Sequence, residues 1–184
     1  MKKLIVSANP SSTGFTHKIV STLSELSQKN GDTVEIMDLY KTDLKQDFLS
    51  YENKKEMWKD DTTKKIQEKI TWADELVFVF PIWWWDTPAI MKNFIDCNFG
   101  AGFAFQYDSN GKSTGLLKWK TARIIATSGA PSFFYKILLH VQILWNMNRI
   151  AFCGIKQKSF TVFGNIDRKT TDRDAYLKTI STLI

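Results

Sequence analysis

The chain has 184 residues, of which 43% are hydrophobic and 24% are charged, the balance of an ordinary soluble globular protein. This composition excludes wholesale disorder, collagen-like repeats and a multi-domain scaffold, and it predicts a single domain over residues 1–184. The net charge is +6, but only four of the 25 basic residues are arginines, so a solvated lysine-rich surface is favoured over a nucleic-acid site.

Cysteine, histidine and hydropathy exclude three further classes of protein. Cys97 and Cys153 are too few for a disulfide framework and lack the spacing of a redox or zinc pair. With two histidines in the chain, we expect no metal site. The apolar run at residues 4–6 is too short for a secretory signal, and the run at 76–85 is too short to cross a bilayer, which takes about 20 residues. We therefore expect a cytoplasmic protein without membrane insertion.

Short apolar runs alternate with amphipathic segments along the chain. Residues 4–6 form a short, nearly uniform apolar run, which suits a strand buried on both faces of a parallel sheet. Residues 75–80 are predicted as a strong central strand, and residues 33–39, 121–127 and 155–162 as three further strands. Helical periodicity is found at residues 16–29, 62–73, 87–96, 132–146 and 170–183. Between them lie a long polar excursion at 40–61 and a turn signal at 108–111. This order predicts an α/β fold, a doubly wound five-stranded parallel sheet in three α/β/α layers.

Ligands of doubly wound sheets bind beyond the carboxyl ends of the strands, where the strand order reverses. The loop after the first strand, residues 7–16, joins small hydroxyl residues and a glycine to a helix N-terminus, which can bind an anion. Ordinary helix capping explains the same residues. The loop has neither the dinucleotide-binding nor the P-loop glycine pattern.

Three consecutive tryptophans, Trp83 to Trp85, follow the third strand between two prolines. Adjacent side chains point in different directions, so at least one indole should lie at a surface or a pocket. Such rings form good walls for a flat heteroaromatic ligand, although core or interface packing is the alternative for Trp83 and Trp85. After the fourth strand, Gly129 permits close backbone approach, while Thr127 and Ser128 can bond a polar ligand edge.

The segment Phe80–Asp96 resembles the flavin-contacting segment of the flavodoxin-like NAD(P)H:quinone oxidoreductases. These include the modulator-of-drug-activity type quinone reductases and the potassium-efflux ancillary reductases. Shorter stretches match the same pattern, at residues 38–40, 73–74, 102–105, 115–118 and 127–131. The resemblance implies a flavodoxin-like fold, a tightly bound FMN (with FAD as the alternative), and a homodimer with the flavin near the subunit interface.

The resemblance also implies which residues bind the flavin and act on the substrate. The phosphate would be held by Asn9, Ser11, Thr13, Gly14, Phe15 and Thr16. The isoalloxazine would be lined by Pro81, Ile82, Trp83, Trp84 and Trp85, and its pyrimidine edge by Thr127, Ser128, Gly129 and Ala130. Tyr135 matches a tyrosine that assists hydride transfer in the animal quinone reductases. His140 falls one residue before the corresponding histidine, and it is also explained as a plain helix residue.

These residues predict an oxidoreductase that passes a hydride from NADH or NADPH through the flavin to a quinone or similar flat acceptor, by a ping-pong mechanism. Amides of Ser128 and Gly129 would stabilise the reduced flavin. A single-electron flavodoxin-type carrier is disfavoured by the charge of +6, because such carriers are typically acidic. A regulatory flavoprotein subunit of a membrane transporter is the remaining alternative.

Overall fold

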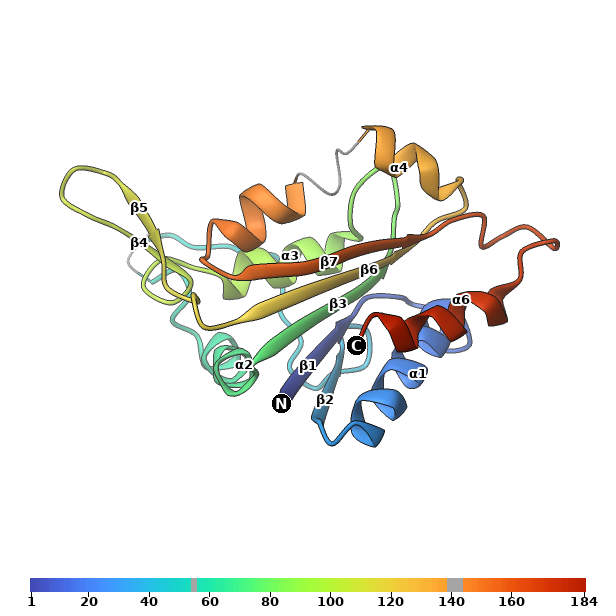
Figure 1. Ribbon diagram of the computed structural model, residues 1–184. Coiled ribbons are helices and arrows are strands. Elements are labelled where there is room, and N and C mark those ends of the chain that lie inside the picture. Colours follow the sequence, from blue (N-terminus) through green and yellow to red (C-terminus); the bar gives the residue numbers. More distant parts are fainter. Residues whose placement is uncertain (54–55, 139–143) are drawn as a thin grey trace.

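The computed structural model describes residues 1–53, 56–138 and 144–184, and Figure 1 shows a central sheet with helices on both of its faces. The sheet contains five strands: β1 Lys2–Ser7, β2 Thr33–Asp38, β3 Glu75–Pro81, β6 Thr121–Thr127 and β7 Lys156–Phe163. They pair in the order β2-β1-β3-β6-β7, and every pairing is parallel. The predicted α/β class and doubly wound five-stranded parallel sheet are confirmed.

Helices and a small hairpin complete the fold. The helical elements are α1 Phe15–Lys29, α2 Asp61–Trp72, α3 Ala89–Asn98, α4 Ser132–Leu138, the π-helix η1 Leu144–Ala151, α6 Arg173–Thr179 and the 3₁₀-helix η2 Ile180–Thr182. The hairpin pairs β4 Phe105–Tyr107 with β5 Ser113–Gly115 around the predicted turn at 108–111, and it extends away from the central sheet (Figure 1). No helix within the described ranges is long and apolar enough to span a membrane.

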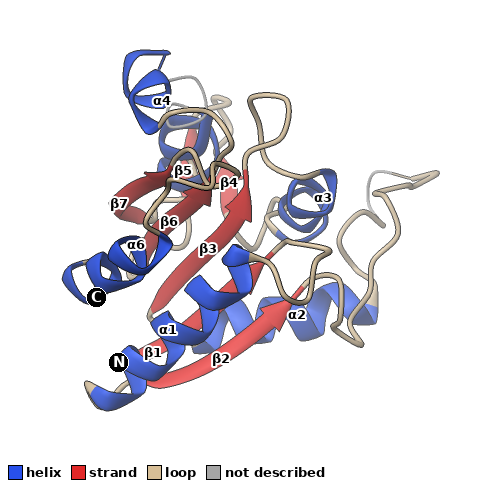
Figure 2. Ribbon diagram, turned by 90° about the vertical axis from the view of Figure 1, so that its right-hand side faces the viewer, coloured by secondary structure: helices blue, strands red, loops and turns tan. Residues whose placement is uncertain are grey.

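Alternate residues of the strands face two separate cores. Leu4, Phe78 and Ile124 belong to the core that α2, α3 and η1 cover. Ile5, Val77 and Ile125 belong to the core under α1 and α6, on the opposite face (Figure 2). Because side chains of a strand alternate between its two faces, uniformly apolar strands are what a sheet covered on both sides requires. The apolar sequences of the three central strands β1, β3 and β6 therefore account for the predicted three-layer arrangement.

The segment 132–146 was expected to be helical, and its described residues are helical. They form α4 over Ser132–Leu138 and the start of the π-helix η1, which runs over Leu144–Ala151 and so continues past the expected end at residue 146. Trp145 and Ile150 of this π-helix belong to the core and are completely buried. His140, predicted as a catalytic residue, lies outside the described residues.

A buried ionic cluster lies at the amino ends of the strands, opposite to the ligand-binding edge. The carboxylate of Glu75 is within 3.0 Å of the Arg123 Nε and 2.9 Å of the Lys158 Nζ, and it lies 3.8 Å from the Lys3 Nζ. Lys3 also pairs with Asp32 at 2.7 Å. Glu75 is completely buried, so these cations balance a charge that burial alone would destabilise.

The start of α2 gives a pH-dependent prediction. The Asp60 carboxylate accepts hydrogen bonds from the backbone N–H and the hydroxyl of Thr63. Burial opposes ionisation, but these bonds outweigh it and hold the pKa of Asp60 below its ordinary value. The carboxylate therefore stabilises the fold above about pH 4, the pKa of an unfolded aspartate, and this stability is lost as the pH falls through the lowered folded pKa.

We expect Asp60→Ala to lower the free energy of unfolding by about 1 kcal/mol at pH 7, because the helix loses its N-cap. The difference from the wild type should shrink below pH 4, and urea unfolding at several pH values measures it. Asp61→Ala is the matched control, since Asp61 is exposed and only forms a surface pair with Lys64. An equal loss in the two variants, or a loss independent of pH, would contradict the capping role.

Candidate functional site

The loop after β1 turns into α1 through a compact set of polar contacts. The side chain of Asn9 accepts a hydrogen bond from the Ser11 N–H at 2.9 Å and donates to the Thr16 Oγ1 at 2.8 Å. The Thr16 hydroxyl lies 3.4 Å from that of Thr127, at the end of β6. These contacts fix the first loop to the carboxyl end of the sheet and leave Gly14 as the N-cap of α1.

The N-terminus of α1 is open for an anion. Gly14 has no side chain to cap the helix, and the first turn carries no acidic residue. The first N–H groups of a helix have no partners within the helix, and they carry the positive end of its dipole. A negatively charged group placed beside Gly14, Phe15 and Thr16 would satisfy these donors.

The loop after β3 is a tight turn across Trp83 to Asp86. The N–H of Trp83 donates to the Asp86 carbonyl at 2.9 Å, and the N–H of Asp86 donates back to the Trp83 carbonyl at 3.0 Å. The indole of Trp84 is 98% exposed, while Trp83 and Trp85 are about half as exposed. The ring of Trp85 contacts that of Tyr135 in α4, with centroids 5.3 Å apart.

The loop after β6 is connected to β7 and to α4. The N–H of Ser128 donates to the Phe163 carbonyl at 2.9 Å, and its hydroxyl lies 2.7 Å from the Tyr135 hydroxyl. The Ala130 N–H donates to the same Ser128 oxygen at 3.0 Å. The Ser128 amide, expected to face a ligand, is therefore used within the fold, because it continues the pairing of β6 with β7. The Gly129 N–H has no hydrogen-bond partner in the part of the chain that the structure describes.

The three loops surround one cavity of about 420 Å³, here called the strand-end cavity. Its lining includes ten of the residues predicted to bind a cofactor: Asn9, Gly14, Phe15, Thr16, Pro81, Ile82, Trp83, Thr127, Ser128 and Gly129. A volume of this size lies within the range of about 300–1,000 Å³ that small-molecule sites occupy. The carboxyl ends of β1 and β3 flank it, where the strand order reverses.

The remaining predicted residues do not line this cavity. Ser11, Thr13, Trp84 and Trp85 are exposed, Ala130 is half-buried and Tyr135 is buried, and none of them is among the residues that line the cavity. Tyr135 is buried and reaches the lining only through Ser128. For these residues a direct contact with a ligand stays a prediction.

Sequence reasoning missed a fourth loop, which follows β7. Ile166, Asp167 and Arg173 complete the lining of the strand-end cavity. The Arg173 guanidinium is oriented by hydrogen bonds to the Ile166 carbonyl at 2.6 and 3.0 Å. Asp167 lies against Gly129, where a Cβ atom would be 2.5 Å from its carboxylate. In a parallel sheet, the end of β7 lies at the same edge as the ends of the other strands, but the residues of this loop have no distinctive pattern that would indicate a site.

Comparisons with known proteins agree with this geometry. The family model described as "Flavodoxin-like fold" matches residues 1–184. The chain is 34% identical over 176 residues to an uncharacterized NAD(P)H oxidoreductase of Haemophilus influenzae, covering 90% of this chain and 85% of the relative. It is 31% identical over 140 residues to an FMN-dependent NADH:quinone oxidoreductase of Mycoplasmoides gallisepticum, covering 73% and 71%.

A solved structure extends the likeness to three dimensions. The crystal structure of Smu.1420 from Streptococcus mutans UA159 matches all of this chain and 98% of its own, with a TM-score of 0.87 and 31% sequence identity. The family match over the whole length, the two relatives and the strand order all agree. The chain therefore belongs to the flavodoxin-like family.

Proposed function

We propose that this chain is an FMN-dependent NAD(P)H oxidoreductase that passes a hydride from the nicotinamide to a quinone or a similar flat acceptor. The observation that carries the proposal is the convergence of three separate strand-end loops on the strand-end cavity, beside an uncapped helix N-terminus. The names of the relatives, an NAD(P)H oxidoreductase and an FMN-dependent NADH:quinone oxidoreductase, support the same reaction class.

The polar end of the cavity fits the phosphate of FMN. The N-terminus of α1 supplies amide donors and a positive dipole, and the side chains of Asn9 and Thr16 lie beside it. Arg173, held in place through the Ile166 carbonyl, supplies a positive charge to the same cavity. FMN is proposed over FAD because the relatives that name a flavin name FMN.

The opposite end fits a planar ring system. Pro81, Ile82 and Trp83 form an apolar wall, and Thr127 to Gly129 form a polar edge. When bound, the flavin accepts a hydride and passes it on, which is chemistry that no side chain here supplies. The chain's part is to orient the ring and to offer the Gly129 N–H to the negative charge that reduction creates.

Tyr135 contacts this polar edge through the side chain of Ser128. Its hydroxyl lies 2.7 Å from the Ser128 Oγ, which also accepts the Ala130 N–H, so the three groups hold the third loop in one shape. Its ring also contacts Trp85. We propose that Tyr135 acts on the acceptor through this network, with nicotinamide and acceptor using the same flavin face in turn.

The proposed function is tested by flavin titration and steady-state turnover. The apo chain should bind one FMN per chain, become yellow and quench flavin fluorescence, and the holoprotein should oxidise NADH or NADPH with benzoquinone. Failure to bind either FMN or FAD would contradict the proposal. Steady binding without turnover would favour the electron-carrier or transporter-subunit alternatives.

Gly129→Val should prevent FMN binding. The Asp167 carboxylate can rotate away from a single added carbon, but the branched side chain would also occupy the cavity. Gly129→Ala is the matched control and should keep most of the affinity, as measured by the same titration. Equal affinity in the wild type and the valine variant would show that the ring does not approach Gly129.

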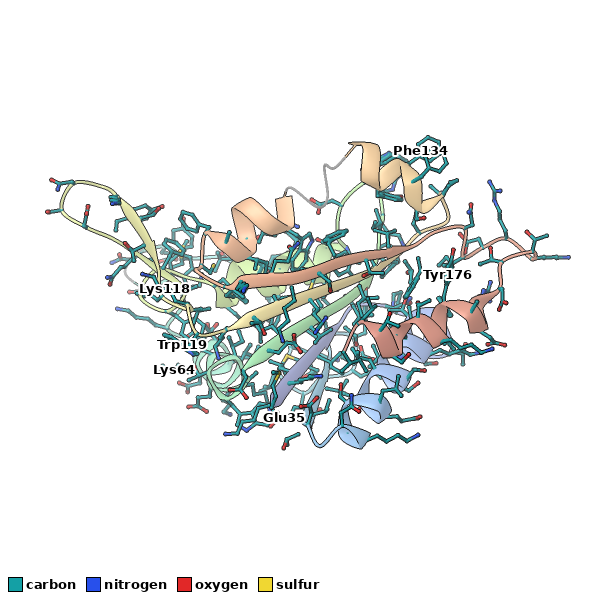
Figure 3. The ribbon with its side chains drawn as sticks, viewed as in Figure 1. Glu35, Lys64, Lys118, Trp119, Phe134 and Tyr176 are labelled. Carbon is teal, nitrogen blue, oxygen red and sulfur yellow. The ribbon has the colours of Figure 1, made fainter. Side chains whose placement is uncertain are left out.

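We further propose that the protein is a cytoplasmic homodimer, joined through an aromatic surface next to the cavity. Phe133 and Phe134 of α4 are stacked with centroids 4.3 Å apart and are 52% and 40% exposed (Figure 3 labels Phe134). Tyr135, next to Phe134 in the chain, contacts Trp85, which is next to the exposed Trp84. Exposed aromatic patches of this kind commonly mark interfaces, and the two free buried thiols suit a reducing compartment.

Trp84→Ser combined with Phe134→Ser should convert the dimer to a monomer, because both changes remove apolar area from the proposed interface. Sedimentation velocity measures the change in mass. Trp119→Ser is the control, since Trp119 is 67% exposed but lies at the far end of the molecule (Figure 3). A wild-type monomer, or a double variant that stays dimeric, would contradict the proposed interface.

A further inference from the structure

The turn from Trp83 to Asp86 has a backbone conformation that bulky residues rarely adopt. Its two central residues, Trp84 and Trp85, have φ angles of 50° and 62°. Positive φ at both central positions is the pattern of a type I′ turn, which Asn-Gly normally occupies. Tryptophan at both positions is strained, and such strain persists only where surrounding contacts over-determine the backbone. A contact outside the turn should therefore hold it.

Among the described residues, one such contact is an ion pair between Asp86 and Arg149 of η1. Both terminal nitrogens of Arg149 lie 3.3 Å from the Asp86 Oδ1, and one of them also lies 3.3 Å from the Oδ2. The Arg149 side chain is 9% exposed and the Asp86 side chain is 41% exposed, so the guanidinium side of the pair is shielded from water while the carboxylate side is partly solvated. The same Asp86 carboxylate accepts the Thr87 N–H, which connects the pair to the backbone that leads into α3.

Arg149 is itself fixed to the core. Its guanidinium lies 5.4 Å from the ring centroid of Trp145, a cation–π contact. Trp145 is completely buried and stacks on Phe80 of β3 at 5.1 Å. Arg149 therefore connects the strained turn to the central strand, through its ion pair with Asp86 and the ring of Trp145.

The conformation of the turn affects two residues that line the cavity, Trp83 directly and Ser128 through its neighbours. Trp83 lines the strand-end cavity directly. Trp85 contacts Tyr135, whose hydroxyl lies beside Ser128, another lining residue. If the turn relaxed to negative φ, Trp83 and Trp85 would both move, although neither Asp86 nor Arg149 lines the cavity.

We propose that Arg149 and Asp86 are a positioning pair that holds the strained Trp84–Trp85 turn against the strand-end cavity. The pair acts on the site through Trp83 and Trp85. The tests of this inference by FMN binding rest on the proposed function. The test by spectra of the apo chain does not.

The first experiment is a double-mutant cycle on FMN binding. R149Q and D86N should each weaken FMN binding by about tenfold, and the double variant should be no weaker than the weaker single variant, because both variants remove the ion pair that they share. K69Q is the matched control and should leave FMN binding unchanged, since Lys69 is also paired with a partly exposed carboxylate, that of Glu35, and neither residue lines the strand-end cavity. Additive effects of R149Q and D86N would overturn the proposal.

The second experiment separates support of the turn from a general electrostatic effect. W84N places a residue that tolerates positive φ at the strained position, and the Trp84 side chain that it removes is 98% exposed. In the W84N background, R149Q should weaken FMN binding by less than about threefold, because relieving one of the two strained residues makes the turn depend less on the pair. The same loss in both backgrounds would overturn the proposal.

The third measurement needs no flavin. In ¹H–¹⁵N spectra of the apo chain, R149Q should shift the indole N–H resonances of Trp83 and Trp85, and adding W84N should reverse those shifts. A wild-type chain that binds no FMN would contradict the proposed function and leave this measurement valid. Indole resonances that R149Q leaves in place would contradict the positioning pair, whatever the outcome of the flavin titrations.

Discussion

Gly164→Ala is expected to displace the third loop of the site and to weaken both FMN binding and the fold. A Cβ atom at Gly164 would lie 2.2 Å from the Ser132 backbone nitrogen and 2.7 Å from the Ala130 carbonyl oxygen. Backbone atoms cannot rotate away as a side chain can, so the loop itself must move. Overpacking of this kind typically costs about 1–3 kcal/mol of stability.

The loop cannot move freely, because backbone hydrogen bonds connect it to the end of β7. The Ser128 N–H donates to Phe163, the Asn165 N–H donates to Ala130, and the Ile166 N–H donates to Ser128, all at 2.9–3.0 Å. We therefore expect FMN affinity to fall by at least about tenfold, or about 1.4 kcal/mol of binding free energy.

Fluorescence titration with FMN and urea unfolding measure the two effects of Gly164→Ala. Gly111→Asn is the control, because Gly111 has a φ of 77° that asparagine tolerates and no atom crowds its Cβ position. A Gly164→Ala variant with wild-type affinity and stability would show that the third loop adapts without affecting the site.

Trp145→Ala should cause the second large effect, this time on stability. Trp145 is completely buried, and its ring lies 4.8 Å from that of Phe78 and 5.1 Å from that of Phe80. Removing a buried tryptophan leaves a cavity in the core, which costs about 3–5 kcal/mol. Arg149 would also lose the ring against which its guanidinium lies.

Urea unfolding of the apo chain measures this loss directly. Trp145→Phe is the graded control and should cost less than half as much, since an aromatic ring still fills part of the space. If alanine and phenylalanine cost the same, the stacking against Phe78 and Phe80 would contribute little, and the buried volume would not explain the stability.

The centre of the sheet could be predicted because β1, β3 and β6 carry apolar runs that a two-sided core explains, whereas the edge strands β2 and β7 are only partly buried. Every residue of β3 is buried, and its alternate side chains enter the two cores. The hairpin of β4 and β5 could not be predicted as strands, because each has three residues, too few for a periodicity. The turn between them was recognisable from residues 108–111, since local backbone preferences decide it.

The parts of the site that could be predicted are the loops whose own sequences are unusual. Glycine and hydroxyl residues indicated the first loop, and the run of tryptophans indicated the second. Asp167 and Arg173 carry no such signal, because a charged loop before a short helix is common on any surface. The use of the Ser128 amide by Phe163 depends on the register of β6 and β7, which a single sequence does not reveal.

The reversal of strand order between β1 and β3 has a consequence for how this protein can change. The chain leaves β1 toward one face of the sheet, where α1 lies, and leaves β3 toward the other, where α3 lies. The strand-end cavity between these two loops is thus produced by the connectivity of the fold rather than by any one side chain. Substitutions on its rim can alter which molecule is accommodated while the underlying architecture persists, so new specificities can evolve here, or be engineered, without redesign of the interior.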